Sequence, residues 1–335
     1  MQARAGAGRT ATTGGFVQPW YTGAHMRPFW FLLAAFAATP ACAGAGAGAT
    51  AAAPPLAPGA ASASAPAAPP AATAATPAGP ERCGELECAL FDTPATALAA
   101  VLEAGPRVLG IGETHAQKGA EGVVSATRRF TDLLPALAPR ASDLIIELWV
   151  ADSRCSKEKV AKVEKQQQAV TRSQAEGNQN EFVTLAERAK ALFVQPHVLR
   201  PSCEEYDEIL RAGDDAIDRM LTMISRLTAA RVKDLLARRG ADAGKMVVTY
   251  GGALHNDVTP RPGRERWSFG PELGAHTGGK YVELDLIVRE YIKDNDSWRA
   301  LPWFAHFDRE RHRDKVVLFR PAPGSYVLIF PGVAS

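Results

Sequence analysis

The sequence contains no cluster of basic residues. It has 38 Lys and Arg against 36 Asp and Glu, and Arg4, Arg9 and Arg27 are the only charged residues before Glu81. The chain from Glu81 onward is therefore almost neutral, with 35 basic and 36 acidic residues. Binding to nucleic acid requires a concentrated positive surface that neutralises phosphates. The even charge distribution argues against nucleic acid as a partner.

Other chemical signatures are also missing. Five cysteines are present, but no two have the C-x-x-C spacing typical of a zinc ribbon. No serine or cysteine lies in a G-x-S-x-G context, which disfavours a reaction through an acyl-enzyme. The apolar run Phe29–Ala38 is too short to cross ~30 Å of bilayer hydrocarbon as a helix.

The N-terminal region is typical of an export signal. Phe29–Ala38 follows an arginine and precedes small residues, like the hydrophobic segment of a signal peptide. Met26 is a natural start for such a signal. Cys42 follows Thr39-Pro40-Ala41, which is similar to the lipobox of bacterial lipoproteins. We expect residues 1–42 to be a leader, so that the protein is either a periplasmic or outer-membrane-associated lipoprotein anchored through Cys42, or a secreted protein cleaved nearby.

The segment of residues 43–80 is composed of Ala, Gly, Pro, Ser and Thr, with one Leu and no charge. Such a composition cannot bury enough apolar surface to offset the loss of chain entropy on folding. We therefore expect a disordered tether, with all the chemistry in one domain over residues 81–335.

Four cysteines remain in that domain when Cys42 is assigned to processing. Cys83 and Cys88 flank a short loop, and Cys155 and Cys203 bracket a helical segment. Two disulfides with this pairing suit an oxidising compartment, although four cysteines allow three connectivities. Unpaired thiols are the alternative.

Strand, helix and strand signals follow one another in the first half of the domain, which predicts a βαβ unit and a parallel sheet. They are a helix that starts at Thr93-Pro94 and ends at Gly105, a strand at Arg107–Gly112, helical spacing of apolar residues over Val123–Leu137, and a strand at Asp143–Trp149.

The second half continues this alternation, and the predicted fold is α/β, with a mostly parallel central sheet flanked by helices, a helical excursion and a C-terminal hairpin. The expected elements are the polar excursion Arg154–Phe193, an amphipathic helix from Ile217 that ends at Gly240, strands at Lys245–Tyr250 and Tyr281–Val288, and a hairpin of Val316–Phe319 with Tyr326–Phe330.

Three of these strands run directly into residues that can move protons or bind metals. The first ends in Glu113 and His115, the second contains Glu147, and the third is followed by His255. Carboxyl ends of parallel strands line one crevice, where ligands bind in open α/β sheets. We expect these four side chains to converge on one pocket.

The motifs VLGIGETH, LIIELW and YGGALHND occur in this order and contain the four residues. Together they resemble the EreA/ChaN-like superfamily, which comprises the Tiki/TraB proteins, the haem-binding ChaN-like lipoproteins and the erythromycin esterases. The resemblance implies an α/β fold and functional roles for Glu113, His115, Glu147 and His255. The E-x-H spacing is nearer the ChaN-like form than the esterase form, whose motif has an extra residue.

Two carboxylates and two imidazoles favour hydrolysis of an amide or ester in a small molecule or peptide. Glu113, His115, Glu147 and His255 could hold Zn or Mn and activate a water, or one His could act as general base beside a Glu. The alternative, which the resemblance implies, is a haem- or iron-binding lipoprotein, with Tyr250 as a candidate axial ligand.

Other polar and aromatic residues are interpreted as structural. Asn256 and Asp257 are expected to support the site or cap a helix, and Glu283 and Asp285 to form a polar strand face, which sheet order could bring near the site. No role is assigned to His197, His276, His306 or His312, and Trp298, Trp303, Phe304 and Phe307 are expected to pack together.

Overall fold

The computed structural model describes residues 82–83, 85–239 and 244–332. The expected leader and tether, with Met26 and Cys42, lie outside the described residues. None of the helices in the described part of the chain combines the length and apolar character that a membrane crossing requires.

The domain is built on one nine-stranded sheet with the strand order β1-β2-β8-β9-β7-β3-β6-β4-β5. All strands from β9 to β5 in this order pair in parallel, whereas β1, β2 and β8 pair antiparallel with their neighbours. The predicted α/β class, the mostly parallel sheet and the closing hairpin (β8 and β9) are confirmed. The strands are β1 Arg82–Cys83, β2 Leu86–Phe91, β3 Val108–Glu113, β4 Ala141–Trp149, β5 Gln195–Leu199, β6 Met246–Gly252, β7 Tyr281–Ile287, β8 Val316–Ala322 and β9 Ser325–Ile329.

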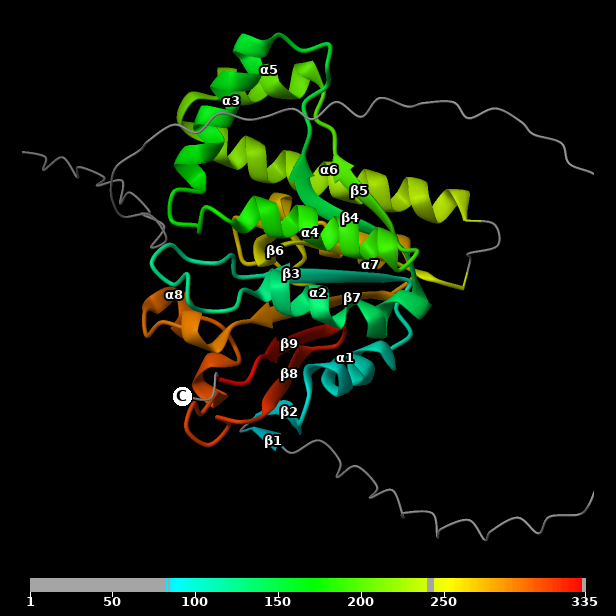
Figure 1. Cartoon of the computed structure of the whole chain (residues 1–335), viewed down its shortest axis with the longest axis vertical. Coiled ribbons are helices and arrows are strands. Elements are labelled where there is room, and N and C mark those ends of the chain that lie inside the picture. The colour runs from blue at the N-terminus through cyan, green and yellow to red at the C-terminus, as the bar shows by residue number, and fades with distance from the viewer. Residues whose placement is uncertain (1–81, 84, 240–243, 333–335) are drawn as a thin grey trace, which may run out of the picture. The chain divides into compact units, whose positions relative to one another are not determined.

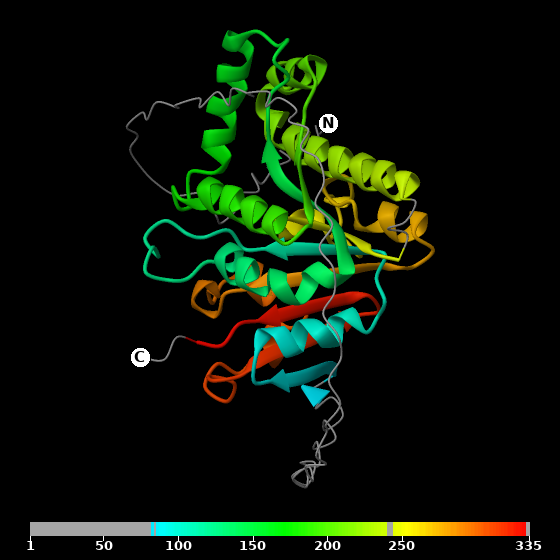
Figure 2. The same cartoon turned by 45° about the vertical axis from the view of Figure 1, so that its right-hand side comes forward.

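Helices cover both faces of the sheet (Figure 1). On one face α1, α2 and α4 form a core with alternate residues of β3, β6 and β7, and on the other face α6 and α7 do so (Figure 2). The helices are α1 Pro94–Leu102, α2 Ala126–Leu137, α3 Lys157–Val170, α4 Asn178–Ala191, α5 Cys203–Arg211, α6 Ala216–Arg238, α7 Gly270–His276 and α8 Asp296–Arg299.

Local signals explain where several helices begin. Thr93 caps α1, whose first residue is Pro94, because its hydroxyl accepts the backbone N–H of Thr96. Ser125 caps α2 in the same way, so this helix begins at Ala126 rather than at the expected Val123. Ser202 and Glu205 form a reciprocal capping box at α5.

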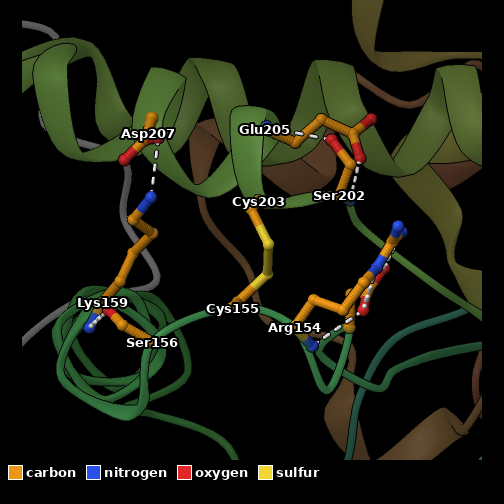
Figure 3. The surroundings of a disulfide bond; sticks show 9 residues. Arg154, Cys155, Ser156, Lys159, Ser202, Cys203, Glu205 and Asp207 are labelled. Carbon is orange, nitrogen blue, oxygen red and sulfur yellow. Dashed lines mark hydrogen bonds and ion pairs between the residues drawn. A yellow bond between two sulfur atoms is a disulfide. The ribbon is translucent and has the colours of Figure 1, made fainter.

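The helical excursion expected at Arg154–Phe193 consists of two helices, α3 and α4. Both disulfides have the expected pairing, Cys83–Cys88 between β1 and β2, and Cys155–Cys203 between the starts of α3 and α5. A salt bridge of 2.7 Å between Lys159 and Asp207 lies beside the second disulfide (Figure 3). These contacts join the excursion to the segment after β5.

A third, smaller core lies where β2, β8 and β9 meet the segment after β7. Trp298 and Trp303 are each 2% exposed and contact one another edge to face. Trp303 also stacks near Phe319 of β8. The expected packing role of the aromatic residues is confirmed.

Candidate active site

The candidate site forms at the carboxyl ends of the central strands. In the parallel register Glu113 of β3 lies beside Gly252 of β6 on one side and Leu286 of β7 on the other. β4 is the other neighbour of β6 and contributes Glu147. Because these strands run in the same direction, their ends bring three separate sequence motifs to one edge of the sheet.

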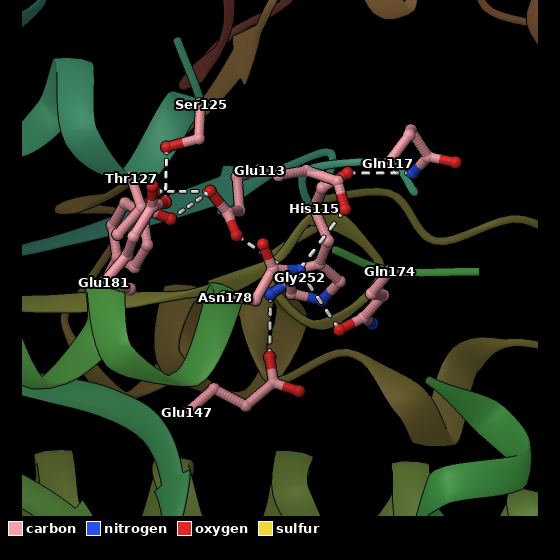
Figure 4. A network of polar contacts seen from close by, with 12 residues as sticks. Glu113, His115, Gln117, Ser125, Thr127, Glu147, Gln174, Asn178, Glu181 and Gly252 are labelled. Carbon is pink, nitrogen blue, oxygen red and sulfur yellow. Dashed lines mark hydrogen bonds and ion pairs between the residues drawn. The ribbon is translucent and has the colours of Figure 1, made fainter. Parts of the chain in front are cut away.

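Glu113 is the buried anchor of the site, with 2% of its surface exposed. Its Oε1 lies 2.7 Å from Nδ1 of His115, and its Oε2 accepts hydrogen bonds from the hydroxyls of Thr127 (2.7 Å) and Tyr250 (2.6 Å) (Figure 4). Burial, followed by the charge and hydrogen bond of Glu113, raises the pKa of Tyr250 well above its ordinary value. The phenol therefore stays protonated and donates to the carboxylate, and both carboxylate oxygens are engaged.

His115 is oriented by this carboxylate. Its Nδ1 faces Glu113, so Nδ1 carries a proton and Nε2 is left to act on a ligand. The side chain is 22% exposed. Burial disfavours the imidazolium, but the hydrogen bond and charge of Glu113 and the charge of Glu147 outweigh burial and raise the pKa of His115.

The loop that carries His115 is fixed by the linker between α3 and α4. The backbone N–H of Ala175 donates to the carbonyl of Ala116 at 2.7 Å, and the N–H of Lys118 donates to the carbonyl of Ser173 at 2.9 Å. Within the loop, the Gln117 side chain donates to the carbonyl of His115 at 2.8 Å. The helical excursion thus helps to position a residue that is distant from it in sequence.

Glu147 and His255 form a second acid–imidazole pair. Glu147 Oε2 accepts the backbone N–H of Gly252 at 2.7 Å, and its Oε1 lies 3.7 Å from Nε2 of His255. His255 donates from Nδ1 to the carbonyl of Trp267 at 2.7 Å, which directs Nε2 toward the carboxylate. A cavity of about 10 Å³ beside this pair is at the lower limit for one water molecule.

Two glycines allow the pairs to approach one another. A β-carbon on Gly251 would lie 2.3 Å from Oε2 of Glu147, so this carboxylate packs directly over the backbone. A β-carbon on Gly252 would lie 3.1 Å from Nε2 of His115 and 3.6 Å from Oε2 of Glu147. The two pairs are therefore neighbours on either side of Gly252.

The four residues do not fit a single shared metal ion in this arrangement. Both oxygens of Glu113 are occupied by hydrogen bonds. No three of the four bring ligand atoms within 4.8 Å of one another, and among the described residues only Asp257, Glu283 and Asp285 do so. The four side chains therefore lie close together as two adjacent acid–imidazole pairs, not around one point.

This acidic triad of Asp257, Glu283 and Asp285 could hold a metal ion. Glu283 and Asp285 lie on one face of β7, opposite apolar residues of that strand, as the expected polar strand face. Glu283 is only 6% exposed, because the segment after β6 covers this face of β7.

The acidic triad is held by neighbouring polar groups. Glu283 accepts hydrogen bonds from the backbone N–H of Val258 (2.5 Å) and the hydroxyl of Ser325 (3.1 Å), and Asp285 accepts one from Asn256 (3.1 Å). Burial and mutual repulsion raise the pKa of Glu283 to about 7 and that of Asp285 well above its ordinary value. Burial raises the pKa of Asp257 to about 6 against the charges of two nearby arginines. Sequence reasoning named these residues but missed the group, because only the order of the strands brings them together.

The remaining candidates have structural surroundings. Tyr250 is 1% exposed and its hydroxyl is bonded to Glu113, so it does not fit the role of a haem ligand. His197 lies between Asp143 (2.8 Å) and Arg231 (2.9 Å).

Comparison with family models, with curated proteins and with solved structures found no match to this chain.

Proposed function

We propose that the protein is a hydrolase that cleaves an amide or ester with a water activated by His115. The observation that carries the proposal is the 2.7 Å hydrogen bond between His115 and the buried, fully hydrogen-bonded carboxylate of Glu113. A carboxylate in this position fixes the tautomer of the imidazole and stabilises the imidazolium that forms when the ring accepts a proton.

In the proposed reaction, Nε2 of His115 takes a proton from water as the water oxygen bonds to the carbonyl carbon. The carbonyl π electrons move to oxygen. When the tetrahedral intermediate collapses, the bond to the leaving nitrogen or oxygen breaks, and the imidazolium returns the proton to the leaving group. Glu113 stays ionised throughout, and the charge of Glu147 adds to the basicity of His115.

Glu147 and His255 are proposed to line the same site on the other side of Gly252. The backbone N–H of Gly252 is engaged by Glu147, so it is not free to bind an oxyanion.

The resemblance to the EreA/ChaN-like superfamily supports the same four residues, and the N-terminal sequence supports a location in the cell envelope. We propose a lipid anchor at Cys42. Fractionation tests it, since Cys42→Ala should move the protein from the membrane to the soluble fraction.

The test of the hydrolase proposal is a panel of amide and ester substrates assayed with the full chain. Wild type should cleave at least one substrate, and His115→Ala and Glu113→Gln should reduce cleavage without altering the circular dichroism spectrum. His276→Ala is the matched control, because His276 is exposed at the end of α7, where the chain leads to the opposite edge of the sheet.

Metal analysis and a hemin titration separate the alternatives. Activity that withstands chelation supports His115 as a metal-free base. Activity that requires Zn or Mn, together with loss of metal binding in His115→Ala, would instead favour the metal route. A Soret shift with hemin and no cleavage would favour the haem-binding alternative and refute the hydrolase.

A further inference from the structure

Three carboxylates meet beside the β3–β7 pair without a salt-bridge partner, and Arg261 and Arg264 act on Asp257 only through their charge at longer range. Asp257 and Asp285 are half-buried and Glu283 is buried. Among the described residues, no Lys, Arg or His nitrogen lies within 4.0 Å of these carboxylates as an ion pair. Buried carboxylates are rarely left without a compensating cation, a proton or a metal ion.

Asn256 supplies an independent observation that points to a ligand. It is 1% exposed, and its amide nitrogen donates to the carbonyl of Gly110 (3.2 Å) and to Asp285 Oδ1 (3.1 Å). Its Oδ1 is buried and has no hydrogen-bond partner in the structure. Turning the amide over would bring Oδ1 against the carbonyl of Gly110, which is itself an acceptor.

Oδ1 of Asn256 lies near Asp285, a member of the acidic triad. A β-carbon on Gly112 would be 2.5 Å from Asn256 Oδ1 and also 2.5 Å from Asp285 Oδ1. Two acceptor oxygens therefore border the same position over Gly112. A buried acceptor without a donor is costly, and a cation beside it removes that cost.

We propose that Asp257, Glu283, Asp285 and the Oδ1 of Asn256 form a binding site for a hard divalent cation, distinct from the Glu113–His115 pair. All four groups offer oxygen, which suits Ca²⁺, Mg²⁺ or Mn²⁺ better than Zn²⁺. The hydrogen bonds to Glu283 from Val258 and Ser325 fix this carboxylate, while the partial exposure of the other two leaves a route for the ion.

A cation at this site would join β7 to the segment that directly follows His255. Asn256 and Asp257 are the next two residues after His255, and Tyr281 already donates to the Asn256 carbonyl at 2.7 Å. The ion would thus stabilise the loop that positions the second acid–imidazole pair.

The experiment is a calorimetric titration of the EDTA-treated full chain with CaCl₂, MgCl₂, MnCl₂ and ZnCl₂ in separate runs. We expect about one hard cation per chain, at least tenfold weaker binding in Asp285→Asn and Glu283→Gln, and near wild-type binding in His115→Ala. Circular dichroism of each variant confirms that it is folded, and Asn256→Leu provides a second variant that removes the unpaired oxygen without changing the charge.

Several results would overturn the proposal. Wild type that binds none of the four cations would indicate that the triad shares protons instead. Binding lost in His115→Ala but kept in Asp285→Asn would place the ion at the acid–imidazole pairs, and preference for Zn²⁺ would contradict the hard-cation class. The readout is binding, so it is independent of whether the hydrolase proposal holds.

Discussion

Replacing Glu113 with Gln removes one negative charge from the centre of the candidate site while nearly preserving its volume. The Gln oxygen can still accept from Nδ1 of His115, but its amide then turns N–H groups toward Thr127 and Tyr250, whose hydroxyls donate to the native carboxylate. A hydrogen bond to a charged group contributes about 1.5–3 kcal/mol. If that interaction stabilises the imidazolium in the transition state, kcat/KM should fall about 10- to 100-fold.

The pH profile of this variant is more diagnostic than its rate. A general base works in its neutral form, so the activity of wild type should rise with pH through the raised pKa of His115. Because Glu113 is a main cause of that raised pKa, Glu113→Gln should move the rise to lower pH while lowering the plateau. An NMR titration of the His115 ring, assigned by comparison with His115→Ala, measures the same shift without a substrate.

A pH profile of activity that keeps its wild-type inflection in Glu113→Gln, with only the plateau reduced, would refute this reasoning.

The raised pKa of His115 also makes the stability of the fold depend on pH. The raised pKa means that the stabilisation by His115 is fully present below the pKa of the unfolded chain and is lost as pH rises through the folded value. Glu113→Gln should flatten that part of the curve of unfolding free energy against pH.

Four further outcomes are expected. In EDTA at pH 8, Asp285→Asn should raise the melting temperature by about 2–4 °C for each kcal/mol of relieved repulsion. The reason is that a carboxyl group with a raised pKa destabilises the fold once the pH exceeds its pKa in the unfolded chain. The gain should vanish at pH 4, and a lower melting temperature of the variant at pH 8 would contradict the prediction. Gly251→Ala should displace Glu147, cost about 1–3 kcal/mol and reduce activity as far as Glu147→Gln does, whereas full activity would show that the contact is dispensable. Replacing Cys155 and Cys203 with Ser opens a 48-residue separation and should cost about 4 kcal/mol in the chain-entropy description, measured by urea unfolding against Cys83→Ser/Cys88→Ser. Deleting residues 43–80 should leave the melting temperature unchanged within error, and a large fall would indicate that this segment packs on the domain.

The parts of the fold that could be predicted are those whose signals are local. Arg107–Gly112 and Lys245–Tyr250 are apolar except for their first residues and Thr249, as strands buried on both faces should largely be, and Thr93-Pro94 marks a helix start. Strand β2 was missed because its burial alternates weakly and its partner, β8, lies more than 200 residues away. Strand β5 was missed because it is short and contains Pro196 at the edge of the sheet.

In the candidate site, too, the contacts that follow from local sequence or strand order could be predicted, and the others could not. The proximity of Glu113 to His115 follows from their two-residue spacing, and that of Glu147 to His255 follows from the parallel order of β4 and β6. The partners of Glu113 could not be predicted, because Thr127 and Tyr250 reach it from α2 and β6 only once α2 packs on the sheet. The acidic triad depends on β7 lying next to β3, and no local pattern in the sequence fixes that order.

On the side of β3 that faces α7, the strand has glycines at positions 110 and 112, and their conservation would have a different cause from that of Glu113 and His115. A β-carbon on Gly110 would overlap the Tyr281 side chain, and one on Gly112 would overlap Asn256, Asp285 and the backbone of Ala253. These two glycines are required for the packing of a loop against the sheet, whereas the adjoining Glu113 and His115 belong to the proposed active site. If the proposed reaction is correct, a distant relative that has lost it should keep the G-x-G pattern and change the E-x-H pattern that directly follows it. The glycines would then be the better marker for tracing descent, and the Glu–His pair the better marker for predicting activity.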